Sequence, residues 1–93
     1  MNNTHYALLN EENKPFAIIN KAAITSAKQL REKIAIAIGE EMGEEFTEEN
    51  IKLSPKDYES IQKAYNDNAF EFTVSSEESG CDYSYKLFPT WEY

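Results

Sequence analysis

One long apolar stripe at helical spacing, in the middle of the chain, constrains the fold more than any other feature. Its members recur three and four positions apart, at Ala27, Leu30, Ile34, Ile38 and Met42. This spacing places them on one side of a helix, so the stretch from Ala27 to Met42 is predicted to be a helix with one buried face.

The residues around this stripe fit the two ends of such a helix. Ser26 with Gln29 three positions later fits a capping box at the N-terminus. Gly43 directly follows the stripe and suits the left-handed position that ends many helices. Gly39 lies inside the pattern and costs about 1 kcal/mol relative to alanine, which indicates either a close contact there or an early helix end.

A second helix is predicted to begin at Ser54-Pro55. Serine is a good N-cap, proline suits the first helical position, and Asp57 lies favourably near the positive end of the helix dipole. Its apolar stripe comprises Tyr58, Ile61 and Tyr65, and residues 66–68 are expected to end it.

Two β-hairpins are predicted, one on each side of the helices. Residues 5–9 and 16–19 are short apolar runs joined by a polar loop that closes with proline. Residues 70–74 and 81–87 alternate apolar and polar side chains around a turn at 75–80. Pro89 is expected to end the last strand.

The element order ββααββ predicts one α+β domain spanning residues 1–93. We expect a two-layer sandwich, with a four-stranded antiparallel sheet made of two hairpins and both helices on one face. The other face would carry Glu71, Thr73, Ser84 and Lys86. With Phe88 and one strand of the first hairpin also pointing there, that face would be partly apolar and suited to an interface.

Charge and composition exclude several classes of function. Net charge is −8, which disfavours direct binding to nucleic acid or to an anionic membrane surface. A single cysteine, Cys81, rules out an internal disulfide. The first residues show no basic region followed by an apolar run, so no signal peptide is expected. We expect a cytoplasmic location, in the host cell if the protein is viral.

A cluster of glutamates is the most unusual feature of the sequence. We call it the acidic ridge, and it comprises Glu40, Glu41, Glu44, Glu45, Glu48 and Glu49. Acids at the C-terminal end of a helix oppose its dipole by about 0.3–1 kcal/mol each, so helix stability does not explain them. We predict that the ridge engages a basic surface on a protein partner; a solvated helix end with no role is the alternative.

Aromatic residues gather near the C-terminus. Phe88, Trp91 and Tyr93 are candidates for a partner-facing patch, because tyrosine and tryptophan are prominent in interface hot spots. Packing in the core and across the hairpin is the alternative explanation.

No catalytic, metal or cofactor motif is recognisable. There is one histidine, His5, and the three glycines are scattered rather than grouped in a phosphate-binding loop. We therefore expect no enzymatic activity, no cofactor and no metal site.

The sequence predicts a small, non-enzymatic protein-interaction module, an inhibitor or immunity-like protein of bacteria or phage by analogy with other tiny acidic proteins. Three alternatives stay open: a nucleic-acid mimic that inhibits a basic nucleic-acid-binding enzyme, a homodimeric structural protein, and a small-ligand binder.

Overall fold

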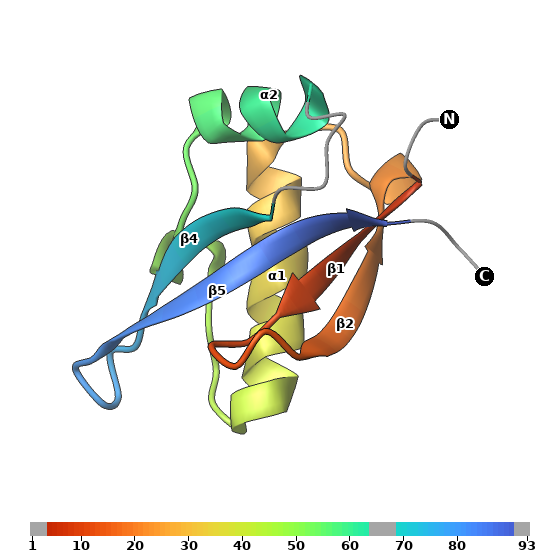
Figure 1. Cartoon of the computed structure of the whole chain (residues 1–93). Coiled ribbons are helices and arrows are strands. Elements are labelled where there is room, and N and C mark those ends of the chain that lie inside the picture. Colours follow the sequence, from red (N-terminus) through yellow and green to blue (C-terminus); the bar gives the residue numbers. More distant parts are fainter. Residues whose placement is uncertain (1–3, 64–68, 91–93) are drawn as a thin grey trace.

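The computed structural model describes residues 4–63 and 69–90 (Figure 1). Two helices and two 3₁₀ turns alternate with strands along the chain. In order, the elements are β1 (His5–Leu9), β2 (Pro15–Asn20), η1 (Lys21–Ala23), α1 (Ala27–Met42), η2 (Glu48–Asn50), β3 (Ile51–Lys52), α2 (Pro55–Lys63), β4 (Phe70–Ser75) and β5 (Asp82–Thr90).

The strands form one antiparallel sheet of five strands, in the order β2-β1-β5-β4-β3. Both expected hairpins are present, and β1 lies beside β5, so the first and last strands meet inside the sheet. The prediction of four strands is wrong, because β3 pairs with β4 through Ile51 opposite Val74 and adds a strand between the helices. Two residues are too few for an alternating pattern to be recognised in sequence.

The two helices lie in different places relative to the sheet. Helix α1 runs across one face, behind the sheet in Figure 1, and α2 lies over the upper end of α1 and the sheet. The core fills the space between the sheet and the two helices. It includes Leu30, Ile34 and Ile38 of α1 and Ile61 of α2. We expected both helices as one layer on a single face; α1 forms that layer, and α2 closes one end of the core.

Register decides which side chains of the sheet face α1. Leu8 lies opposite Leu87, and Phe72 opposite Tyr85, and all four are buried in the core. The rings of Phe72 and Tyr85 stack at a centroid distance of 6.3 Å, and Phe16, the extra residue of a bulge in β2, meets Tyr85 edge-on at 5.7 Å.

The opposite face of the sheet has a polar part and an apolar part. Glu71 lies opposite Lys86, and Thr73 opposite Ser84. Phe88 lies opposite Ala7, whose other neighbour is Ile18 of β2. Phe88 and the first hairpin therefore do make this face partly apolar, as the alternation in sequence indicated.

Helix α1 begins and ends where its sequence predicts. The Ser26 hydroxyl accepts a hydrogen bond from the Gln29 amide at 3.2 Å, while the Gln29 side chain accepts from the amide of Thr25 at 2.7 Å. Gly43 ends the helix in the left-handed conformation, with φ of 71°. The sequence gives these ends because each satisfies a backbone group that the helix leaves unpaired.

Helix α2 has a reciprocal cap. Ser54 Oγ accepts from the Asp57 amide at 3.1 Å, and Asp57 Oδ2 accepts from the Ser54 amide at 2.9 Å. Tyr58 and Ile61 are buried as the stripe predicts. The third stripe residue, Tyr65, and the expected helix end at 66–68 lie outside the described residues.

Two details of the last strand differ from expectation. Pro89 does not end β5, which continues to Thr90 with Pro89 buried opposite Tyr6. Beyond Leu87, β5 pairs only with β1 among the described strands, and proline is tolerated where one edge of a strand has no partner. Cys81 is exposed and precedes the strand rather than pointing inward.

Neither described helix has both the length and the apolar character that crossing a lipid bilayer requires.

Candidate functional site

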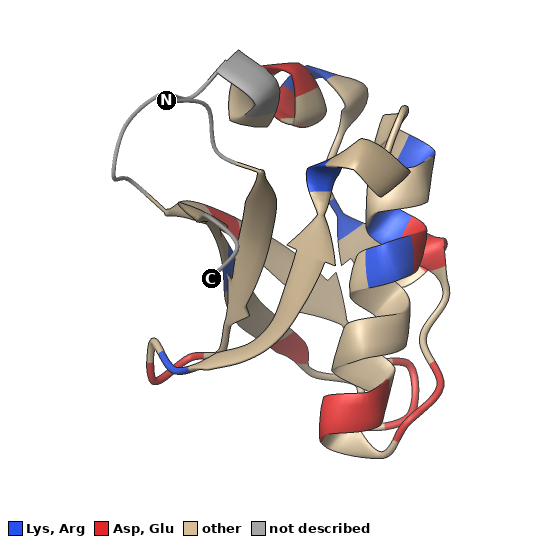
Figure 2. Cartoon of the chain, turned by 90° about the vertical axis from the view of Figure 1, so that its right-hand side faces the viewer, with Lys and Arg blue, Asp and Glu red and all other residues tan. Residues whose placement is uncertain are grey.

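Charge is separated along α1. The N-terminal half of the helix carries three basic residues and one acid, Glu32, whereas the charged residues at its C-terminal end and in the segment that follows are all acidic (Figure 2). The basic residues are Lys28, Arg31 and Lys33, and all members of the acidic ridge lie on the other side of Ile38 in sequence. The ridge is therefore one end of an electrically polarised element, as the sequence indicates.

Gly39 explains how the chain turns back after the helix. Its carbonyl accepts hydrogen bonds from the amides of Gly43 and Glu44, at 2.8 and 3.2 Å. A Cβ atom on Gly39 would lie 2.8 Å from the carbonyl oxygen of Glu44 and 4.0 Å from the Phe46 ring. Only glycine allows the returning chain to pass this close. Of the two explanations that the sequence offered for Gly39, a close contact is therefore correct, and an early helix end is not.

A groove lies between the C-terminal half of α1 and the returning chain. Its volume is about 370 Å³, and we call it the acidic groove. Its lining residues are Ala35, Ile36, Gly39, Glu40, Glu44, Glu45, Phe46 and Thr47. Its apolar lining includes Ile36, which is 61% exposed, and the half-buried Phe46, and its acidic lining includes the exposed Glu40 and Glu45.

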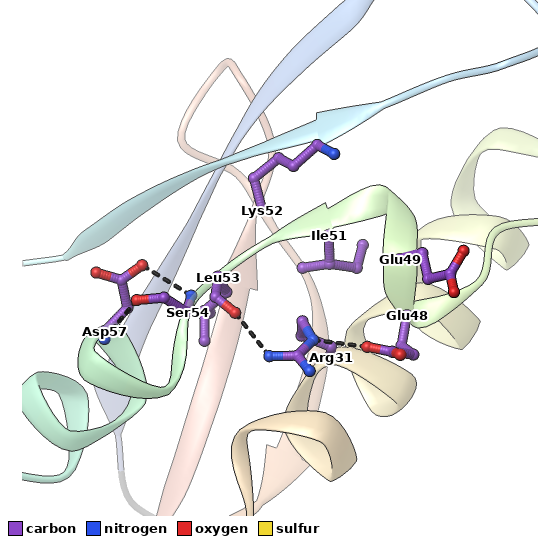
Figure 3. A pocket seen from close by; sticks show the side chains of 8 residues that line it. All are labelled: Arg31, Glu48, Glu49, Ile51, Lys52, Leu53, Ser54 and Asp57. Carbon is purple, nitrogen blue, oxygen red and sulfur yellow. Dashed lines mark hydrogen bonds and ion pairs between the residues drawn. The ribbon is translucent and has the colours of Figure 1, made fainter.

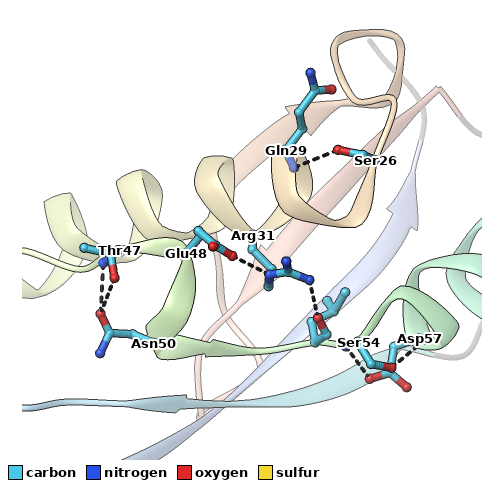
Figure 4. Close-up of polar contacts among 9 residues, drawn as sticks. Ser26, Gln29, Arg31, Thr47, Glu48, Asn50, Ser54 and Asp57 are labelled. Carbon is cyan, nitrogen blue, oxygen red and sulfur yellow. Dashed lines mark hydrogen bonds and ion pairs between the residues drawn. The ribbon is translucent and has the colours of Figure 1, made fainter.

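The returning chain is fastened to the rest of the fold beyond Gly39. Ser76 Oγ, on a buried residue after β4, donates to Glu44 Oε2 at 2.5 Å. Arg31 Nε donates to Glu48 Oε2 at 2.7 Å, and its Nη1 donates to the Leu53 carbonyl at 2.8 Å (Figure 4).

Asn50 adds a further attachment. Its amide nitrogen donates to the Ser75 carbonyl at 3.0 Å, and its oxygen accepts from the Thr47 amide at 2.9 Å. The segment from Glu44 to Asn50 is thus tied to α1, to β4 and to the turn after β4. The backbone of an acidic loop held in this way does not have to be ordered when a partner binds.

These contacts divide the acidic ridge into two sets. Glu44 and Glu48 are half-buried and support the fold through Ser76 and Arg31. Glu40, Glu41, Glu45 and Glu49 are exposed, and within the described part of the chain their carboxylates form neither a hydrogen bond nor an ion pair. Sequence spacing could not make this distinction, because it depends on which distant residues meet each carboxylate.

The field of the acids reaches the sheet. Burial raises the pKa of Tyr85, and nearby carboxylates, among them Glu11 and Glu41, raise it further because they disfavour a second negative charge. Tyr85 of β5 therefore lies near members of the acidic ridge and near Glu11 of the first hairpin loop.

A larger cavity of about 600 Å³ lies between α1, β3 and α2 (Figure 3). Four of its polar side chains are engaged, Arg31 with Glu48 and the Leu53 carbonyl, and Asp57 with Ser54, whereas Glu49 and Lys52 have no side-chain partner within the described part of the chain. We interpret this cavity as the joint that holds β3, because the contacts of Arg31 connect α1 to the segment around that strand.

A small cavity of about 150 Å³ lies near the other end of α1, lined by Tyr6, Lys21, Ile24 and Tyr58. The ammonium of Lys21 lies 5.0 Å from the centre of the Tyr6 ring, and burial lowers the pKa of Lys21. These contacts are internal, and the cavity has no group that points to a ligand.

The predicted aromatic patch is only partly located. Phe88 is half-buried on the sheet face that points away from α1, so it does not join the acidic ridge in one surface. Trp91 and Tyr93 lie outside the described residues. Over residues 4–63 and 69–90, no group of three or more His, Cys, Asp or Glu side chains could hold a metal ion.

Sequence reasoning missed Ile36, the most exposed apolar side chain of α1. Ile36 lies two positions from both Ile34 and Ile38, which puts it about 200° around the helix from each of these buried residues. An isoleucine on the polar side of a helix beside glutamates was the signal that could have found the groove.

No protein-family model matches this chain, and neither do any curated protein or solved structure. Function must therefore be argued from the site, since a fold alone does not specify one. The acidic groove combines a largely exposed isoleucine, Ile36, with exposed glutamates.

Proposed function

We propose that this chain is a small, non-catalytic protein-interaction domain that binds a basic protein partner at the acidic end of α1. The observation that carries the proposal is the fastening of Glu44–Asn50 to the fold, which holds the backbone of the exposed Glu45 and Glu49 in place and brings Glu45 to the same groove as Glu40. A backbone held in place loses little freedom on binding, so more of the attraction between its exposed glutamates and a basic surface is retained as affinity.

Long-range charge supports the same conclusion. A chain of net charge −8 attracts a basic partner before contact and accelerates the encounter, an effect that added salt screens. An inhibitor or immunity-like role in the cytoplasm, or in a host's cytoplasm, fits such a domain. A partner whose own ligand is nucleic acid is a narrower form of the proposal, because its binding channel would be basic.

The test compares two variants of equal charge. One carries Glu→Gln at 40, 41, 45 and 49; the matched control carries Glu→Gln at 11, 12, 77 and 78, which are also exposed. Each removes four negative charges and so changes the net charge from −8 to −4. Nuclease-treated lysate from the source cell is captured on wild type and on both variants, and bound proteins are quantified by mass spectrometry.

We expect a basic protein that is retained by wild type and by the matched control and lost from the ridge variant, with capture declining as salt rises. Equal capture by the two variants would show that only net charge matters and would refute the proposal.

Self-association is a second candidate, favoured by one observation on strand β2. This strand is at one edge of the sheet, carries no charged residue, and exposes 64% of Ile18. An uncharged edge strand with an exposed isoleucine can pair with a second copy of itself. Light scattering over a range of concentrations tests this candidate, and a monomer at the highest concentration would eliminate it.

A further inference from the structure

We propose that the acidic groove receives one large apolar side chain of the partner, and that lysine or arginine flanks this side chain on both sides. This inference rests on the proposed function and adds to it a specific anchor. It identifies the ligand as a protein segment that is basic around a single apolar residue.

The apolar lining of the groove is the reason for expecting an apolar side chain in the ligand. Ile36 is 61% exposed, Phe46 is half-buried, and between them Gly39 exposes backbone with no side chain. A volume of about 370 Å³ falls in the range of roughly 300–1,000 Å³ typical of ligand sites. Covering Ile36 with an apolar side chain removes from water an isoleucine that this fold otherwise leaves exposed.

Charge complementarity selects the occupant. Glu40 and Glu45, both exposed, belong to the lining of the groove. A ligand in the groove therefore lies close to these acids, which attract lysine and arginine. A second copy of this chain would bring another −8 to the same place, so a basic segment of another protein is the occupant that fits.

The experiment uses defined peptide probes and ¹⁵N-labelled protein. One peptide has tryptophan at its centre and lysine or arginine at every other position; a second has glycine at its centre and is otherwise identical. Dissociation constants are measured by NMR titration, and the amides that shift locate the site. We expect the tryptophan peptide to bind ~10-fold more tightly, with shifts at residues 35–47.

Two serine variants localise the anchor. Ile36→Ser should remove most of the difference between the two peptides, whereas Ile18→Ser, the matched control of similar exposure on the far edge strand, should leave it unchanged. Both side chains are mainly exposed, so both variants are expected to fold.

Salt separates this inference from the proposed function. Added salt should weaken both peptides alike while the ratio of their dissociation constants stays constant, because apolar contact is not screened. Salt-sensitive binding of both peptides with equal affinity would overturn the anchor and leave the basic-partner proposal standing. Absence of any binding by either peptide would overturn both, and tryptophan-dependent shifts located at β2 instead of α1 would overturn the anchor.

Discussion

Two isoleucines of this protein are equally exposed and lie in contrasting surroundings. Ile18 is 64% exposed on the edge strand β2, and Ile36 is 61% exposed on helix α1. Strand β2 carries no charged residue around Ile18, whereas Ile36 lines a groove together with glutamates. Exposure is the same in both places, so the neighbours decide what each surface can bind.

The backbone around the two isoleucines differs as well. At Ile18 one edge of β2 faces away from the sheet, which suits pairing with another strand. At Ile36 the neighbouring Gly39 lets a returning loop approach, and that loop is fastened by the side chains of Arg31 and Ser76 and by the backbone carbonyl of Ser75. A preorganised concave surface suits a side chain, and an open strand edge suits a backbone.

The largest expected effect is on stability and concerns Tyr6 of β1, the strand that pairs with β2. Burial, with a smaller contribution from Tyr58, raises the pKa of Tyr6 to about 12 from its usual 10.0. Tyr6 stays neutral in the folded protein while the unfolded chain ionises, so the unfolded state binds fewer protons between these pH values. The stabilisation that the neutral Tyr6 contributes is therefore fully present well below pH 10. The free energy of unfolding should fall by up to about 3 kcal/mol as the pH rises to 12.

Urea unfolding of wild type and Tyr6→Phe at several alkaline pH values measures this loss. Phenylalanine cannot ionise, so the variant should lose less stability over the same pH range. Parallel curves for the two proteins would mean that Tyr6 ionises equally in the folded and unfolded states.

A smaller effect is expected at the groove from Gly39→Ala. The new methyl would press on the Glu44 carbonyl at 2.8 Å, and overpacking costs about 1–3 kcal/mol against a gain of about 1 kcal/mol in helix propensity. We expect a net loss of about 1 kcal/mol by chemical denaturation, together with weaker preference for the tryptophan peptide.

Gly43→Ala is the control for this change. Nothing lies within 4 Å of its Cβ position, but φ of +71° disfavours alanine, at a cost of about 1–2 kcal/mol. It should lose stability while keeping the peptide preference. Identical peptide preference in Gly39→Ala and wild type would show that the approach of the loop does not shape the groove.

The smallest effect on stability is expected from the two isoleucines themselves. Ile18→Ser and Ile36→Ser should each change the free energy of unfolding by no more than about 0.5 kcal/mol, because both side chains are largely exposed. If β2 mediates self-association, Ile18→Ser alone should lower the molecular weight measured by light scattering. A large loss of stability in either variant would show that its isoleucine packs more tightly than its exposure indicates.

Local sequence signals predicted most of the fold. The caps of α1 at Ser26 and Gly43 and the cap of α2 at Ser54 are as predicted, because each depends on residues close in sequence. Strand β3 and the continuation of β5 through Pro89 were not predicted, because both depend on which strand lies alongside.

The candidate site was predicted in composition and not in shape. The acidic ridge was evident, but the division of its members into Glu44 and Glu48, which support the fold, and four exposed carboxylates required the positions of Ser76 and Arg31. The groove depends on the contact between Gly39 of α1 and Phe46 of the returning chain, which the sequence does not reveal.

The sequence by itself determined α1 with both its ends, the start of α2, both hairpins, the alternation of faces in the sheet, the net charge of −8 and the acidic ridge at the end of α1 and beyond it. These follow from periodicity and from hydrogen bonds between near neighbours. Tertiary structure alone decided the strand order, the fastening of the acidic loop and the contrast between Ile18 and Ile36. Each of these depends on contacts between residues far apart in the chain, which no local pattern encodes.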